Sequence, residues 1–242
     1  MRTKLFFTLC CVLLSVVISA ASFETDSFKT KDGHTLTIRF IKHGSLALIY
    51  DNHTIQVDPV SVYADYSKFP KADVILITHE HPDHLDLKAI SVLEKKGTVI
   101  VANESSQKKI GKGIAMKNGD KLEPVPYLNI EAVPAYNTTR GKEQFHPKSR
   151  DNGYILTLGG DRIYIAGDTE DIPEMKKLKN IDIAFLPVNQ PYTMTVEQAV
   201  KAAKMFKPRI LYPYHYGGTN AIEIKEKLKN ERSIDVRIRQ MQ

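Results

Sequence analysis

The chain has 242 residues, which is enough for one hydrophobic core or at most two small domains. With 42% hydrophobic and 26% charged residues, its composition is that of a soluble globular protein and excludes a disordered, fibrous or repetitive one. The formal net charge of +6 slightly favours an anionic small-molecule substrate, but the charges are scattered, so a solvated mixed surface is the better interpretation. The absence of a basic stripe in the sequence argues against a nucleic acid as partner.

Residues 1–21 have the order of a secretory signal peptide. Arg2 and Lys4 precede an apolar run over 5–18, and small residues fill 19–21. That run is shorter than the roughly 20 apolar residues that a membrane-spanning helix needs, although an anchoring helix is the alternative interpretation. We predict cleavage before about Ser22. The mature protein is then periplasmic or secreted and has no stable membrane anchor.

Both cysteines, Cys10 and Cys11, lie inside this predicted signal peptide. The mature chain can therefore form no disulfide. Its stability has to come from its core and from any metal that it binds.

The first half of the mature chain reads as short strands with one helix between them. Strands are predicted over 35–41, 45–50, 53–57, 73–77 and 98–102, and a helix over 85–96. The stretch 73–77 (DVILI) is almost continuously apolar, which is typical of a strand buried on both faces.

The second half also reads as short strands with helices between them, but it does not repeat the sequence of the first half. Strands are predicted over 128–135, 154–158, 162–166, 181–186, 209–212 and 234–238, and helices over 195–206 and 221–229. Gly159-Gly160-Asp161 indicates a hairpin, and Thr195 with Gln198 forms a capping box. Helices follow strands throughout and no linker divides the chain. We predict one α/β (α+β) domain with mixed sheets over 22–242.

Residues 78–86 read THEHPDHLD, directly after the buried strand. His79 and His81 are two apart on an extended backbone, so their rings leave the same side and can share one ion. Asp83 and His84 are expected to begin the following helix with side chains directed back to the same space. Imidazole and carboxylate ligands suit Zn²⁺, Mn²⁺ or Fe. The alternatives are a His-rich surface loop or a set of buried, hydrogen-bonded histidines.

Further metal-binding side chains occur at the ends of predicted strands. Asp58 ends HTIQVDP, Asp168 ends IYIAGD, and His215 ends ILYPYH. His146 lies in the segment QFHP after the strand 128–135. A centre with more than one metal has its additional ligands among these residues.

The H-x-H-x-D-H motif, the later Gly-Asp-Thr and the late strand-end histidine resemble the metallo-β-lactamase-fold hydrolase superfamily. The order of Asp58, the cluster, Asp168 and His215 is similar to that superfamily's motif order across nearly all of the mature chain. More narrowly, the chain resembles the branch with ascorbate-phosphate lactonase-like and N-acyl phosphatidylethanolamine phospholipase D-like proteins. The resemblance implies a four-layer αββα sandwich of two mixed β-sheets flanked by helices, with a dinuclear site along one edge.

The resemblance also implies a role for each residue of the cluster. His79 and His81 would hold the first metal. Asp83, His84 and His215 would hold the second.

Three more positions complete the implied site. Asp168 would bridge both metals, and Asp58 would support the site without binding metal. The third histidine of the first metal is assigned to His146, because many relatives carry a histidine where this chain has Tyr136-Asn137. The alternative is that Asn137 or water completes that site.

The implied activity is that of an exported, metal-dependent hydrolase. Two divalent ions about 3.5 to 4 Å apart, most simply Zn with Mn or Fe as alternatives, would share a hydroxide that attacks an ester, lactone or phosphodiester. Asp83 and Asp168 are the predicted catalytic residues. The alternatives are a non-catalytic or degenerate metal-binding protein of the same fold, or a redox member of the superfamily. The sequence leaves the substrate and the oligomeric state open.

The three remaining histidines are given ordinary structural roles. His34 is expected to be exposed, and His53 to lie on a strand face. For His43, beside Gly44 at a strand junction, a place near the site is the less favoured alternative.

Overall fold

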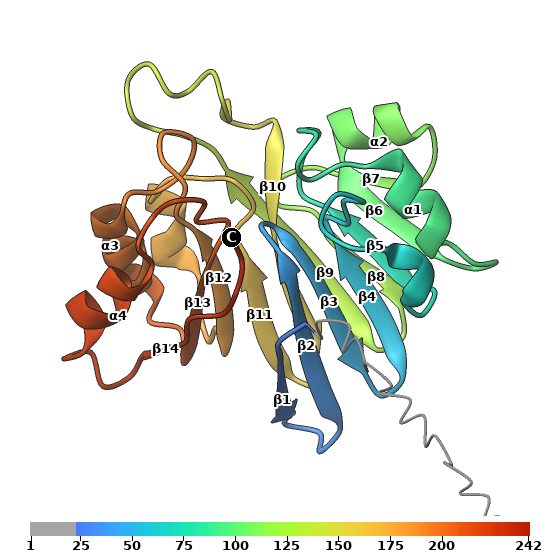
Figure 1. Ribbon diagram of the computed structural model, residues 1–242, viewed down its shortest axis with the longest axis horizontal. Coiled ribbons are helices and arrows are strands. Elements are labelled where there is room, and N and C mark those ends of the chain that lie inside the picture. Colours follow the sequence, from blue (N-terminus) through green and yellow to red (C-terminus); the bar gives the residue numbers. More distant parts are fainter. Residues whose placement is uncertain (1–22) are drawn as a thin grey trace, which may run out of the picture.

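The computed structural model describes residues 23–242. Over this range the chain forms two seven-stranded sheets that pack face to face, with helices on the two outer faces (Figure 1). The predicted signal peptide, 1–21, lies outside the described residues. Among the residues that are described, no helix has the length and apolar character needed to cross a bilayer.

The first sheet follows the chain order from β1 to β7. Its strands are β1 (Thr25–Lys29), β2 (Thr35–Lys42), β3 (Ser45–Tyr50), β4 (His53–Val57), β5 (Val74–Ile77), β6 (Val99–Asn103) and β7 (Ile114–Met116). β1 to β4 pair antiparallel, and β4 to β7 pair parallel. Parallel neighbours need crossover connections, which here contain the short helices.

The second sheet has the order β14-β13-β12-β11-β10-β9-β8. Its strands are β8 (Lys121–Val125), β9 (Leu128–Ala135), β10 (Asp151–Leu158), β11 (Asp161–Ile165), β12 (Ile183–Pro187), β13 (Ile210–Tyr214) and β14 (Asp235–Val236). β8 to β11 pair antiparallel, and β11 to β14 pair parallel. Each half of the described chain is therefore an antiparallel meander followed by parallel crossovers.

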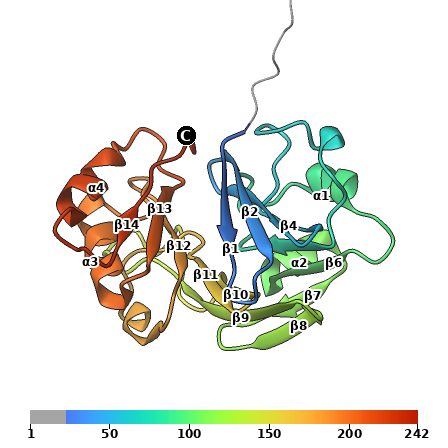
Figure 2. The same ribbon diagram turned by 90° about the horizontal axis from the view of Figure 1, so that it is seen from below.

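Helices cover the outer face of each sheet. The α-helices are α1 (Leu87–Leu93), α2 (Glu104–Ile110), α3 (Val196–Phe206) and α4 (Ile222–Leu228), and the 3-10 helices are η1 (Tyr66–Lys68) and η2 (Pro173–Lys177). Figure 2 shows α1 and α2 on one outer side and α3 and α4 on the other, with both sheets between them. This confirms the predicted four-layer αββα sandwich.

The strand β5 shows why the sequence folds in layers. Val74 and Leu76 face the core between the two sheets, whereas Ile75 and Ile77 face the smaller core beneath α1. Each of these side chains is fully buried, and burying one stabilises the fold by about 1.5–3 kcal/mol. The predicted burial of 73–77 on both faces is confirmed, and the end of this strand fixes where the histidine cluster begins.

Several predicted boundaries were wrong. The helix expected over 85–96 is only α1, because Asp86 caps it by accepting hydrogen bonds from the backbone N–H groups of Lys88 and Ala89. Asp83 and His84 thus lie in a turn before the helix and not in its first turn. The last strand, expected over 234–238, is the two-residue β14. The elements β1, α2, β7 and β8 were not predicted, because none has a clear apolar period.

Candidate metal centre

The candidate site residues gather where parallel strands of both sheets end. Asp58 follows β4, His79 comes shortly after β5, Asp168 shortly after β11 and His215 directly after β13. His146 reaches the same place from the long connection between β9 and β10. The carboxyl ends of parallel strands are the usual place for sites in α/β folds, and here two sheets contribute to one site.

The first donor group consists of three histidines from two segments, His79, His81 and His146. One ligand nitrogen of each lies within 4.8 Å of the others. The two closest are His79 Nε2 and His81 Nδ1, which are 3.1 Å apart. Thr78 Oγ1 donates its hydrogen to Asp58 at 2.6 Å, so it accepts from His79 Nδ1–H at 3.0 Å. The lone pair of His79 therefore lies on Nε2, the nitrogen that faces the group.

The second donor group consists of His43, Asp83, His84 and His215, whose ligand atoms also lie within 4.8 Å of one another. Asp83 Oδ2 is 3.4 Å from His215 Nε2 and 3.9 Å from His84 Nε2. Burial raises the pKa of Asp83, but the neighbouring imidazoles of His215 and His43 outweigh burial and hold the pKa well below its usual range. Asp83 is therefore ionised at neutral pH.

Asp168 lies between the two donor groups. Its Oδ2 is 3.4 Å from His146 Nε2 on one side and 3.4 Å from His215 Nε2 on the other, while its Oδ1 is 3.5 Å from His84 Nε2. Burial raises the pKa of Asp168, yet the neighbouring imidazoles outweigh that effect and keep the pKa below its ordinary value. A buried carboxylate in this position is placed to bridge two cations.

Many buried polar atoms of the centre have no hydrogen-bond partner among the described residues. They are His84 Nε2, both ring nitrogens of His146 and of His215, and Asp168 Oδ1. Each buried polar atom without a partner costs about 1–3 kcal/mol, so their concentration in one place needs an explanation. Divalent metal held by these residues would supply it, because neutral imidazoles and carboxylates are the ligands that Zn²⁺, Mn²⁺ and Fe prefer. The donor set fits the metal that the sequence predicts.

Asp58 supports the centre without belonging to either donor group. Its Oδ1 accepts a hydrogen bond from the Thr78 backbone N–H at 2.8 Å, and its Oδ2 is 2.8 Å from His84 Nδ1. When His84 is neutral, Nδ1–H donates to this carboxylate and the lone pair on Nε2 faces the donor group. Asp58 also has a left-handed backbone, with φ of 42°, which stores strain next to the site.

Two residues near the centre were not assigned to it from the sequence. His43, whose place at the site was the less favoured alternative, has its Nε2 3.0 Å from Asp83 Oδ2. Arg150 belongs to none of the motifs in the sequence, yet its Nη2 is 3.4 Å from His81 Nε2 while the same guanidinium pairs with Asp151. The neighbouring His43-Gly44 turn was the sequence feature that could have identified the first of them.

Asn137 is the alternative to His146 as a ligand in the first donor group. Its Nδ2 donates to the backbone carbonyls of Lys142 at 3.2 Å and Tyr192 at 2.8 Å. It thereby ties the connection that carries His146 to the loop of Tyr192. His146, the residue assigned from the sequence, is the one that the structure groups with the cluster.

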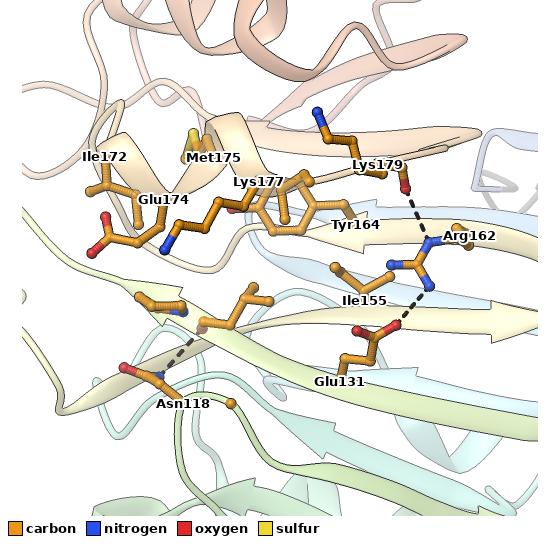
Figure 3. Close-up of a pocket in the computed structure, with 14 residues that line it drawn as sticks. Asn118, Glu131, Ile155, Arg162, Tyr164, Ile172, Glu174, Met175, Lys177 and Lys179 are labelled. Atoms are coloured by element: carbon orange, nitrogen blue, oxygen red, sulfur yellow. Dashed lines mark hydrogen bonds and ion pairs between the residues drawn. The ribbon is translucent and has the colours of Figure 1, made fainter.

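A separate cavity of about 400 Å³ lies over β9, β10 and β11 beneath η2 (Figure 3). Its walls include Ile155, Tyr164 and Met175, and at its rim Arg162 pairs with Glu131 at 2.6 Å. It contains none of the donor residues. The candidate chemistry of the chain therefore lies at the donor groups and not in this cavity.

The comparisons with known proteins agree with this geometry. A family model described as "Beta-lactamase superfamily domain" matches residues 37–215, a range that contains both donor groups. A UPF0173 metal-dependent hydrolase of Thermococcus kodakarensis is 33% identical over 193 residues, covering 74% of this chain and 84% of that protein.

Solved structures have the same architecture. The crystal structure of a predicted metal-dependent hydrolase from Parabacteroides distasonis is 70% identical, with a TM-score of 0.90, over 91% of this chain and 100% of that one. The metallo-β-lactamase fold protein YhfI of Bacillus subtilis shares the fold at 16% identity, with a TM-score of 0.63, over 81% of this chain and 88% of that one. The chain therefore belongs to the UPF0173 metal-dependent hydrolase family of the metallo-β-lactamase superfamily.

Proposed function

We propose that this protein hydrolyses an ester, lactone or phosphodiester bond at a dinuclear metal centre. The observation that carries the proposal is the position of Asp168, whose carboxylate lies between two separate groups of buried imidazoles. One cation would be held by His79, His81 and His146, and a second by Asp83, His84 and His215, with Asp168 shared. Zn²⁺ is the proposed metal, with Mn²⁺ or Fe as alternatives.

When bound, two divalent cations supply a water of lowered pKa and neutralise the negative charge that develops on the attacked carbonyl or phosphoryl group. The protein contributes orientation and a proton path. Asp83 is the carboxylate of the centre that solvent reaches, since its side chain is 41% exposed while that of Asp168 is 3% exposed. Because Asp83 is ionised, it can take a proton from the attacking water and later pass that proton to the leaving group.

Aromatic side chains neighbour two of the donor residues, His146 in the sequence and His43 in space. The rings of Phe145 and Tyr192 meet edge to face at 5.0 Å, and Phe145 directly precedes His146. Tyr63 contacts the ring of His43 at 5.5 Å. These rings would limit the access of water to the reacting bond and would give the substrate apolar contacts.

The finer description of the substrate rests on the sequence motifs. The resemblance to lactonase-like and phospholipase D-like proteins supports a small-molecule lactone or phosphodiester over a β-lactam. The order of charged, apolar and small residues over 1–21 supports export to the periplasm or the medium, with no membrane anchor after cleavage.

A substrate screen with metal as a variable tests the proposal. Protein reconstituted with Zn²⁺ or Mn²⁺ is assayed on model lactones, esters and phosphodiesters, and then assayed again after chelation. Activity on at least one class should disappear on chelation and in Asp168→Ala and His81→Ala, whereas His53→Ala, at the opposite end of β4 from Asp58, should keep it.

Near-wild-type turnover in either of the two site variants would refute the assignment. A fully metal-loaded protein that hydrolyses nothing in the panel would favour the degenerate metal-binding alternative.

A further inference from the structure

His43 lies in the turn between β2 and β3, far in sequence from the other residues of the centre. Its ring centroid is 3.6 Å from that of His215 and 5.5 Å from that of Tyr63. Its side chain is only 14% exposed. The imidazole is therefore packed between the rings of His215 and Tyr63.

The contact between His43 and Asp83 has a defined direction. The Asp83 carboxylate is ionised and can only accept, so the hydrogen bond of 3.0 Å is donated by His43 Nε2–H to Asp83 Oδ2. That same oxygen lies 3.4 Å from His215 Nε2. The oxygen that accepts from His43 is thus the one that faces His215, a proposed ligand of the second cation.

The backbone around His43 holds the residue in this position. Its φ is 57°, in the left-handed region that residues with a side chain rarely adopt. The surrounding chain fixes this conformation, since its N–H donates to the Met241 carbonyl at 3.2 Å and its carbonyl accepts from the His215 N–H at 3.1 Å. The next residue is Gly44, where an added Cβ would stand 2.7 Å from the His84 ring.

We propose that His43 is a positioning residue of the second metal site, which orients the Asp83 carboxylate through Nε2–H and does not itself bind the cation. The inference rests on the proposed dinuclear centre. Carboxylate ligands in metal sites are usually hydrogen-bonded by such outer residues, and their loss typically costs 10–100-fold in metal affinity. The second site should therefore depend on His43 although the first does not.

Titration of the metal-free full chain with Zn²⁺ alone tests the inference by calorimetry and by metal count. His43→Asn removes Nε2 yet tolerates the left-handed backbone. His43→Gln keeps an amide N–H at the reach of Nε2. His34→Ala is the matched control, because His34 directly precedes β2 as His43 follows it, and it also pairs with a carboxylate, Asp51, at 3.3 Å.

We expect wild type and His34→Ala to bind two Zn²⁺. His43→Asn should bind the second about 10–100-fold more weakly and keep the first, and His43→Gln should recover most of the loss. Unchanged Zn²⁺ binding in His43→Asn would overturn the inference about His43 and leave the dinuclear centre standing. The same holds if His43→Gln binds the second Zn²⁺ as weakly as His43→Asn does. A wild-type protein that binds fewer than two Zn²⁺ would overturn the dinuclear centre itself. Thermal unfolding of each metal-free variant separates a folding defect from a lost contact.

Discussion

At the scale of single residues, two imidazoles of the centre are held by a hydrogen bond at the nitrogen that faces away from their donor group. The pairs are His79 with Thr78 and His84 with Asp58. Both contacts keep a proton on Nδ1 and orient the ring so that Nε2 faces the donor group, which lowers the cost of forming the site.

Gly44 lies so close to the His84 ring that no side chain fits at this position without moving the ring. An alanine Cβ there would stand 2.7 Å from His84 Cε1, so the ring has to move away from the donor group. We expect Gly44→Ala to weaken the binding of the second cation by tenfold or more. Gly218→Ala is the matched control, because nothing lies within 4 Å of its added Cβ. Equal Zn²⁺ affinities in the two variants would contradict this account of His84.

Metal binding should release a proton from His84. Burial lowers the pKa of His84, but Asp168, Asp58 and Asp83 outweigh burial and raise it to about 9 in the metal-free protein. Below that pH a cation has to displace the proton, so affinity rises with pH up to about 9 and this dependence ends above it. His146 contributes no proton at neutral pH, because burial lowers its pKa to about 4.

Calorimetry at pH 7.5 in buffers of different ionisation enthalpy measures the released protons. Asp58→Asn serves as reference, since losing that carboxylate lowers the pKa of His84. Wild type should release more protons than the variant, by up to one. Equal release would show that His84 is already neutral in the metal-free protein.

At the scale of elements, the short helix α1 fixes the turn that carries Asp83 and His84. Asp86 caps the helix with one carboxylate oxygen, and its other oxygen accepts from the Ser61 N–H at 2.7 Å. Asp86→Ala should cost about 0.5–2 kcal/mol of stability and also weaken metal binding. Thr195→Ala, which removes the capping box of α3, should cost a similar stability and leave metal binding intact. Urea unfolding and Zn²⁺ titration of both variants distinguish the two effects.

The elements that were predicted correctly are those whose own residues form a recognisable local pattern. β5 was predictable because Val74 to Ile77 are apolar on both faces, and α3 because of its capping box. β1 was not, since its exposed, mostly polar residues become a strand only by pairing with β2. Tertiary pairing decides such segments, and a single sequence does not contain it.

The same distinction explains the candidate site. The donors in 79–84 were predictable because they are close together in sequence, and the strand-end residues because parallel strands end at one edge. The contact of His43 with Asp83 joins residues 40 apart, one in the turn between β2 and β3 and one in the turn after β5, so the His43-Gly44 turn could mark His43 but not its partner.

At the scale of the whole molecule, the centre joins the two sheets. The His215 N–H donates to the His43 carbonyl at 3.1 Å, and the Tyr154 hydroxyl donates to the Ile77 carbonyl at 3.0 Å, so each contact links one sheet to the other. Cations bound between these sheets would stabilise the folded chain only, because the unfolded chain has no assembled site.

Removing the metal should therefore lower the thermal stability. A ligand at about 100 times its Kd contributes about 2.7 kcal/mol, which corresponds to a Tm shift of about 5–10 °C for a domain of this size. Thermal unfolding before and after chelation measures the shift. Zn²⁺ should restore the original Tm and Mg²⁺ should not, because nitrogen ligands suit Zn²⁺. A Tm that chelation leaves unchanged would indicate that no structural cation joins the sheets.

The most direct test of the dinuclear centre is the number of metal ions per chain, measured by elemental analysis of purified protein reconstituted with Zn²⁺, Mn²⁺ or Fe. The arrangement of two donor groups around Asp168 predicts about two ions per chain in the wild type and fewer in Asp168→Ala. One ion or none in the reconstituted wild type would contradict it.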